Sequence, residues 1–190
     1  MRPSLFLIAV FVSLALLLAL PSTCHAQTVT DILDFNDSSF GYPNYVTLVQ
    51  VQNGNLYGST TAAPFTSFGT LFGITPTGEV AIEYTGFDYV HGACPCGGMT
   101  LATNGTLYGT TEYSGATADT AGVIYNFTTS GSYNALYQFV LPTGSFPCGP
   151  PIQGSDGNFY GASNGIHVVS GTPSTIYQYV PNRRRGKPDS

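Results

Sequence analysis

The sequence predicts an all-β protein made of about three four-stranded units, similar to the blades of a β-propeller, after an N-terminal signal peptide. Two observations carry this prediction. An octamer recurs at residues 53, 104 and 156, with spacings of 51 and 52 residues. Each period also holds short runs of alternating apolar and polar residues and no helical pattern. Four strands in a period near fifty residues are typical of a propeller blade. Closed propellers use four or more blades, so we expect an incomplete array: a fragment, an open stack or half of an oligomeric ring.

The octamer explains why the units repeat. Each copy begins with Asn-Gly or Asp-Gly, which predicts a tight hairpin turn with positive φ at both central residues. The next two residues start a strand, and the glycine after the tyrosine suits a place where another backbone approaches closely. A calcium loop at Asp156 would need further oxygen ligands and a final glutamate, which the sequence lacks. The residues that define the repeat are Gly54, Tyr57, Gly58, Gly105, Tyr108, Gly109, Gly157, Tyr160 and Gly161.

The N-terminus predicts export. Arg2 precedes an apolar run from Leu5 to Leu20, and a short segment follows that ends in the small residue Ala26. This pattern is typical of a signal peptide over residues 1–26, with cleavage after Ala26. A lipoprotein would need an aliphatic residue where Pro21 stands, and a retained membrane anchor would need about twenty apolar residues. We therefore expect a secreted or cell-surface protein.

Charge separates the body from the tail. There is no lysine or arginine between Pro3 and Asn182, and residues 183–190 form a basic tail that we expect to be disordered. Clustered basic residues make most phosphate contacts, so the acidic body argues against nucleic-acid binding. The sequence predicts neither a cofactor nor a metal site. Residues 27–182 form the predicted repeat region.

The strands can be placed in chain order. A lone strand at 31–35 resembles the last strand of a unit, which a closed propeller uses to complete its final blade. The first unit covers 40–88, with strands at 45–51, 56–61, 70–75 and 80–87. The second covers 91–140, with strands at 99–102, 107–113, 123–128 and 133–139. The third covers 146–180, contracts between Gly161 and Gly165, and ends with a strand at 175–180.

Three cysteines follow the predicted cleavage site: Cys94, Cys96 and Cys148. Cys96 and Cys148 lie 52 residues apart, each directly after a proline. Equivalent positions of neighbouring repeats are close in space, and exported chains keep disulfides, so we predict a bridge from Cys148 to either Cys94 or Cys96. His91 and the nearby thiols lack the second ligand pair that a zinc site needs.

The repeated motifs D/N-G-x-L-Y-G-T-T and G-T-L-F-x-I-T-P-x-G resemble the GloVer tandem repeat of bacterial exported proteins grouped as "choice-of-anchor". The resemblance covers roughly Asp31 to Val180. It implies a secreted or surface-attached β-propeller-like protein, usually with more repeats, and no established activity. The chain departs from the pattern at Gly73 and Asn126, where the family often has lysine, and in its shortened third repeat. No apolar sorting anchor precedes the basic tail.

Candidate catalytic residues are few. Glu79 and Glu83 are expected on one strand face, with Asp88 and Glu112 near loops, and a carboxylate pair could serve glycoside hydrolysis. Ser155 and Ser163 lack the G-x-S-x-G context of a nucleophile. His91 and His167 stand alone. No catalytic residue is predicted.

The tyrosines of the octamer form one column, which we expect to pack between blades; a platform for stacking sugars is the alternative. Three hypotheses for function remain: a surface binding or scaffold module whose partner is a glycan or a cell-surface component, a carbohydrate-active or carbohydrate-binding propeller, and a truncated piece of a longer propeller. Open ends of the array predict self-association.

Overall fold

A computed structural model describes residues 27–35, 41–43, 46–61, 68–88, 90–114, 120–140, 144–164 and 174–181. By its contacts the chain divides into Met1–Asp31 and Ile32–Ser190, and all strands among the described residues belong to the second unit. The predicted signal peptide, the basic tail and His167 lie outside the described residues.

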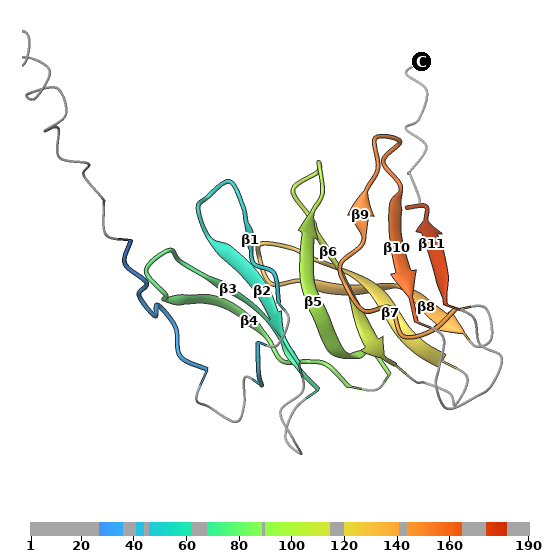
Figure 1. Cartoon of the computed structure of the whole chain (residues 1–190), viewed down its shortest axis with the longest axis horizontal. Coiled ribbons are helices and arrows are strands. Elements are labelled where there is room, and N and C mark those ends of the chain that lie inside the picture. The colour runs from blue at the N-terminus through green and yellow to red at the C-terminus, as the bar shows by residue number, and fades with distance from the viewer. Residues whose placement is uncertain are drawn as a thin grey trace, which may run out of the picture. The chain divides into compact units, whose positions relative to one another are not determined.

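The fold is all-β, as predicted, and the described residues form three antiparallel sheets (Figure 1). Sheet I contains β1 (Val49–Gln50), β2 (Leu56–Thr60), β3 (Thr70–Ile74) and β4 (Val80–Tyr84). Sheet II contains β5 (Ala93–Leu101), β6 (Leu107–Tyr113), β7 (Thr120–Phe127) and β8 (Tyr133–Val140). Sheet III contains β9 (Ile152–Gln153), β10 (Phe159–Ser163) and β11 (Thr175–Tyr179). In every sheet each strand pairs with its neighbour in sequence.

The three sheets share one register. Tyr57 lies opposite Gly73 in sheet I, and Tyr108 lies opposite Asn126 in sheet II. The equivalent pair of sheet III is Tyr160 with Gln178. Because side chains alternate along a strand, each sheet has a tyrosine face, which carries the octamer tyrosine, and a glycine face, which carries the glycine after it.

Two strand predictions were wrong. Residues 31–35 form no strand, although the Phe35 ring lies 5.1 Å from the Phe72 ring. The third unit does not contract after Gly161, because Ser163 pairs with Thr175 just as Thr60 pairs with Thr70. β11 therefore corresponds to β3, and sheet III has no fourth strand among the described residues. Gly165 was matched to a repeat glycine by spacing, but pairing register sets the equivalence.

The octamer turns also differ from the prediction. In the first hairpin the Gly54 N–H donates to the Val51 carbonyl, and Gly54 has a φ of 88°. Asn53 is not among the described residues with positive φ. This is the three-residue hairpin loop that ends in a left-handed glycine bulge, and not a primed two-residue turn. The Asn53 side chain accepts the Asn55 N–H at 3.0 Å, which stabilises the turn from within.

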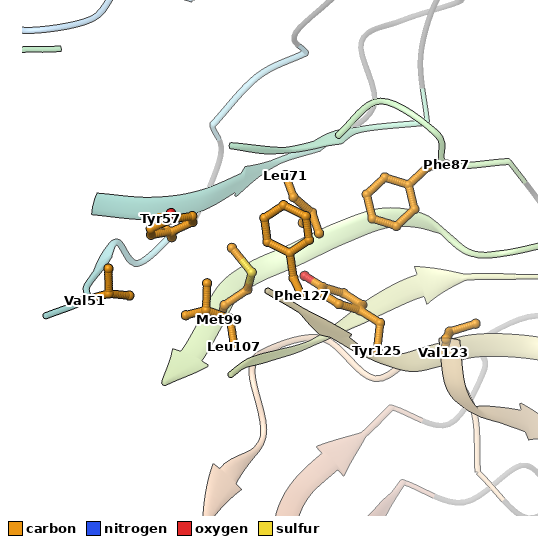
Figure 2. Packing of buried hydrophobic residues seen from close by; sticks show 9 residues of the cluster. All are labelled: Val51, Tyr57, Leu71, Phe87, Met99, Leu107, Val123, Tyr125 and Phe127. Carbon is orange, nitrogen blue, oxygen red and sulfur yellow. The ribbon is translucent and has the colours of Figure 1, made fainter. Parts of the chain in front are cut away.

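Neighbouring sheets bury their facing surfaces. The larger core cluster joins the tyrosine face of sheet I to the glycine face of sheet II, as Figure 2 shows. Its members are Val51, Tyr57, Leu71, Phe87, Met99, Leu107, Val123, Tyr125 and Phe127. A smaller cluster of Ala102, Tyr108 and Phe159 joins sheet II to sheet III in the same sense. The tyrosine faces of sheets I and II are thus each covered by the sheet that follows in the chain.

Candidate functional site

The repeated tyrosines of sheets I and II are buried between sheets. Tyr57 is fully buried, and its hydroxyl donates to the Thr129 carbonyl oxygen at 3.3 Å. Its ring meets Phe127 of sheet II edge-on, with the ring centroids 6.5 Å apart. Tyr108 stacks on Phe159 of sheet III at 4.0 Å. Neither ring presents a face on which a sugar could stack.

Tyr160 of sheet III has a different environment. It is only half-buried, and its hydroxyl donates to Asp156 Oδ2 at 2.7 Å. The same hydroxyl accepts from Gln178 Nε2 at 2.8 Å. The hydrogen bond from Tyr160, with those from Asn158, lowers the pKa of the Asp156 carboxyl. These bonds hold Asp156 inside its own hairpin, where the sequence could also suggest a calcium loop.

The glycine after each tyrosine is covered by an aromatic ring. Phe72, Tyr125 and Tyr177 lie directly across the ladder from Gly58, Gly109 and Gly161. A Cβ at Gly58 would come within 2.7 Å of the Phe72 ring, and one at the other two glycines would overlap a tyrosine hydroxyl. The crowding was predicted, but its source is a cross-strand ring and not a second backbone.

Close backbone approach occurs instead at Gly97 and Gly98. Thr47 and Gly98 form a parallel bridge that joins the first strands of sheets I and II. A Cβ at Gly97 would lie 2.6 Å from the Gly149 Cα, at the start of the third unit. The backbone just before β1 and the backbone just before β9 therefore each approach β5 at these glycines, and only glycine leaves room for this contact.

Two equivalent joints connect the units. The Cys94 N–H donates to the Phe68 carbonyl at 2.8 Å, and the Phe146 N–H donates to the Ala121 carbonyl at 2.9 Å. Cys94 and Phe146 have φ values of 55° and 54°, and they are the two described non-glycine residues with positive φ. The proline after each of them covers a left-handed glycine, Gly69 in the first joint and Gly122 in the second.

Cys96 and Cys148 lie at the second joint. The buried Cys96 thiol donates to the Pro147 carbonyl oxygen at 3.7 Å, and the exposed Cys148 directly follows that proline. Burial and the neighbouring Cys148 raise the pKa of the Cys96 thiol. The structure records no disulfide among the described cysteines, so the predicted bridge stays a prediction.

Two tyrosine hydroxyls near these thiols are buried without a hydrogen-bond partner in the described structure, those of Tyr125 and Tyr177. Burial raises the pKa of both groups, and Cys96 adds to the effect. Glu112 raises the pKa of Cys96 as well, and with burial it raises the pKa of Tyr113 to about 12. The Cys96 thiol and these tyrosine hydroxyls stay protonated at neutral pH, which suits packing better than acid–base chemistry.

A family model described as the Gloeobacter/Verrucomicrobia repeat matches residues 21–184. The chain belongs to the Gloeobacter/Verrucomicrobia repeat family. A search among curated proteins found no match.

In this Gloeobacter/Verrucomicrobia repeat protein the candidate acids do not converge. β4 begins at Val80, so Glu79 lies in the preceding hairpin and does not share a strand face with Glu83, which corrects the prediction. Asp88 binds the His91 backbone and ring at 2.6 and 2.9 Å, and these bonds lower the pKa of its carboxyl. Within the described ranges, no three His, Cys, Asp or Glu residues gather as a metal site.

The remaining hydroxyl candidates of the repeat protein have structural positions. Ser163 is buried and shares a hydrogen bond of 2.7 Å with Thr175, while Ser155 lies in the third octamer turn. Among the parts of the chain that the structure describes, no helix is long and apolar enough to cross a membrane.

Sequence reasoning missed the joints of the repeat protein. The signal was present as a residue before proline that recurs 52 positions apart, at Cys94 and Phe146. The left-handed conformation at these positions could not be inferred, because a bulky residue with positive φ is uncommon and has no sequence signature. The glycines at 69 and 122 show the same spacing within one residue and were interpreted only as loop ends.

Proposed function

We propose that this chain is an exported scaffold module whose sheets stack as the blades of a propeller-like array and present surfaces for binding, without catalysis. The observation that carries the scaffold role is the use of the repeat-defining residues. Tyr57 and Tyr108 pack between sheets, and the octamer glycines serve turns and ring contacts. The repeated positions therefore hold the sheets together. We expect binding specificity to come from positions that vary between units.

The parallel contact of the first strands supports the propeller-like arrangement. Thr47 bridges Gly98, and Gly97 approaches Gly149, so the start of each unit approaches the start of the following unit. Blades in a propeller place their innermost strands in this way around a common axis.

Export is tested at the N-terminus. The gene should be expressed with its own first 26 codons in a bacterial host, and the protein should be recovered outside the cytoplasm with Gln27 as its first residue. N-terminal sequencing and cell fractionation measure this. Recovery of a cytoplasmic chain that keeps Met1 would overturn the proposal.

As part of this proposal, Cys96 and Cys148 form a disulfide in the exported protein. The Cys96 thiol contacts the carbonyl of Pro147, the residue directly before Cys148, so the two cysteines of neighbouring units lie near each other. A disulfide needs Cα atoms within about 7 Å. Oxidation would release two protons and two electrons to an exported thiol oxidant or to oxidised glutathione. It would fix the third unit to the second at their joint.

Non-reducing peptide mapping of the exported protein tests the bridge. We expect the 96–148 cross-link in the native chain and in the Cys94→Ser variant, and its loss in Cys148→Ser. A Cys94–Cys148 cross-link, or three free thiols in protein from an oxidising compartment, would contradict this pairing.

A further inference from the structure

Two equivalent clefts lie between the first hairpin turns of neighbouring units, and in one of them a side chain of the chain itself joins the two turns. Between the second and third units this side chain is Gln153 of β9. Its Oε1 accepts the Thr103 N–H at 2.8 Å, and its Nε2 donates to the Gly157 carbonyl oxygen at 3.5 Å. One carboxamide therefore binds a donor of the second unit and an acceptor of the third.

In the cleft between the first and second units, Leu101 stands where Gln153 stands in the other. Leu101 lies opposite Leu107, three residues before the second octamer. Gln153 lies opposite Phe159, three residues before the third octamer. A leucine side chain neither donates nor accepts a hydrogen bond. The two backbone groups that a carboxamide would bind in this cleft are therefore available to another molecule.

Those two groups are the N–H of Gln52 and the carbonyl of Gly105. Gln52 directly precedes its octamer, as Thr103 does, and the two turns have the same hydrogen bonds, so the Gln52 N–H points toward the following unit. In the first unit the carbonyl equivalent to that of Gly105 belongs to Gly54 and accepts from Gln50 Nε2 at 3.0 Å. Within the described part of the chain, neither the Gln52 N–H nor the Gly105 carbonyl has a hydrogen-bond partner.

A cleft of about 220 Å³ lies at these two groups. It is lined by Val51, Gln52, Asn53, Leu101, Gly105 and Thr129. None of these side chains is charged, so the cleft suits an uncharged ligand. Val51 belongs to the core cluster and is 8% exposed, and the Tyr57 hydroxyl holds the Thr129 carbonyl at 3.3 Å. The packing of the two units therefore fixes the lining before any ligand binds, as in most small-molecule sites.

We propose that this cleft binds the amide group of a small ligand, with the ligand oxygen on the Gln52 N–H and the ligand N–H on the Gly105 carbonyl, as Gln153 binds in the neighbouring cleft. The carbon next to the amide packs on Leu101 and Val51. A free carboxamide and the acetamido group of an N-acetylated sugar offer the same donor, acceptor and apolar carbon. The site goes beyond the scaffold role, and it depends neither on export nor on the disulfide.

The test is a titration of the ¹⁵N-labelled full chain, expressed with its own N-terminus and purified as the host delivers it, followed by two-dimensional amide NMR. Propionamide should shift the amide signals of Gln52 and of Thr106, whose nitrogen follows the Gly105 carbonyl. We expect a dissociation constant on the order of 10 mM, because so small a ligand gains little binding free energy. The Thr103 signal should not respond, since Gln153 already holds its N–H.

Two further ligands define the chemistry of the site. Propionate has no N–H to donate to the Gly105 carbonyl, and it should bind at least about 10-fold more weakly than propionamide. N-acetylglucosamine distinguishes the two sources of the amide. Tighter binding of the sugar than of propionamide assigns the site to acetamido groups, and the reverse order assigns it to free carboxamides.

Leu101→Gln supplies the carboxamide from the chain itself, and Leu101→Met is the matched control, because methionine has nearly the same size and no amide. We expect Leu101→Gln to weaken propionamide binding by at least about 10-fold and Leu101→Met to keep it. The reverse variant, Gln153→Leu, should create a second site, in which propionamide now shifts the Thr103 signal. The amide spectrum also verifies that each variant is folded, and Gln153→Leu serves if the Leu101 variants unfold.

Several results would overturn the proposal. These are a Gln52 signal that does not respond to propionamide, propionate that binds as tightly as propionamide, and equal losses in folded Leu101→Gln and Leu101→Met. A folded Gln153→Leu variant whose Thr103 signal ignores propionamide would also overturn it, because the two clefts would then not be equivalent.

Discussion

Phe72, Tyr125 and Tyr177 occupy one column, and the two tyrosines differ from the phenylalanine only by a hydroxyl that has no hydrogen-bond partner in the described structure. A buried hydroxyl that loses water and gains no partner costs free energy. The ring supplies the packing over the glycine, and the hydroxyl adds nothing to it. At the residue scale, phenylalanine, which the first unit has at this position, is therefore expected to stabilise the fold more than tyrosine.

This contrast predicts that Tyr125→Phe will raise the free energy of unfolding by about 1 kcal/mol, because it removes the buried hydroxyl and keeps the ring. The matched control is Tyr57→Phe. The Tyr57 hydroxyl donates to the Thr129 carbonyl, so its removal should lower the free energy of unfolding by about 1 kcal/mol. Urea unfolding measures both. Equal effects of the two variants would mean that the Tyr125 hydroxyl has a partner after all.

The residue scale is also where prediction from sequence was least complete. The octamer glycines were correctly expected in turns and crowded places, because glycine has few other reasons to recur at a fixed position. The identity of the crowding group could not be predicted, since the ring over Gly109 comes from Tyr125 on another strand. The left-handed Cys94 could not be found, because its conformation is imposed by the joint and not by its side chain.

At the scale of elements, the joints between units are the places where the sheets are held together. Gly122 has a φ of 102°, and a Cβ there would overlap Pro147 and lie 2.7 Å from the Thr111 carbonyl oxygen. Gly105 also has positive φ, but its Cβ would meet nothing within 4 Å. Both glycines need a positive φ, but only Gly122 has neighbouring atoms that a Cβ would overlap.

Gly122→Ala should therefore lower the free energy of unfolding by about 3 kcal/mol or more, from left-handed strain together with overlap at the joint. Gly105→Ala should lower it by only about 1 kcal/mol, since it meets the backbone strain alone. Chemical denaturation followed by tyrosine fluorescence measures the difference. Similar losses for both variants would show that the Pro147 contact relaxes easily and that the joint is not rigid.

Strand positions of the first two units followed from alternation and turn residues, because hairpins are local and their signals lie close together in sequence. The third unit was misread for a physical reason. Its loop after Ser163 contains Gly165, which spacing suggested as the next repeat glycine, whereas the ladder continues at Thr175. Register is decided by which residues pair across the sheet, and glycine spacing carries no information about that.

For the whole molecule, tyrosine burial couples stability to alkaline pH. Burial raises the pKa of six tyrosine side chains in the folded state, and for Tyr113 it reaches about 12 with the help of Glu112. These residues are Tyr84, Tyr113, Tyr125, Tyr133, Tyr177 and Tyr179. Unfolded tyrosine ionises near pH 10. A pKa raised on folding means that the stabilisation is complete below pH 10 and is lost as the pH rises above it.

We expect the free energy of unfolding to be constant with respect to these groups up to about pH 9 and to fall steadily from about pH 10. The part of the ultraviolet tyrosinate absorbance that comes from the buried rings should then change together with the far-UV circular dichroism, because these rings ionise only on unfolding. Complete ionisation near pH 10 with the β-sheet signal retained would show that the rings are accessible in the folded protein.

The equivalence of the two joints also bears on the gene. The donors Cys94 and Phe146 lie 52 residues apart, and each meets the carbonyl before a left-handed glycine and is followed by a proline. Deletion of the 52 codons for residues 94–145 would join Ala93 to Phe146. Phe146 could then donate to the Phe68 carbonyl, with Pro147 over Gly69. The tyrosine face of sheet I would receive the glycine face of sheet III. Recombination at this boundary changes the length of the protein by whole units and keeps the joint, so a lineage can add or lose units without redesigning any contact.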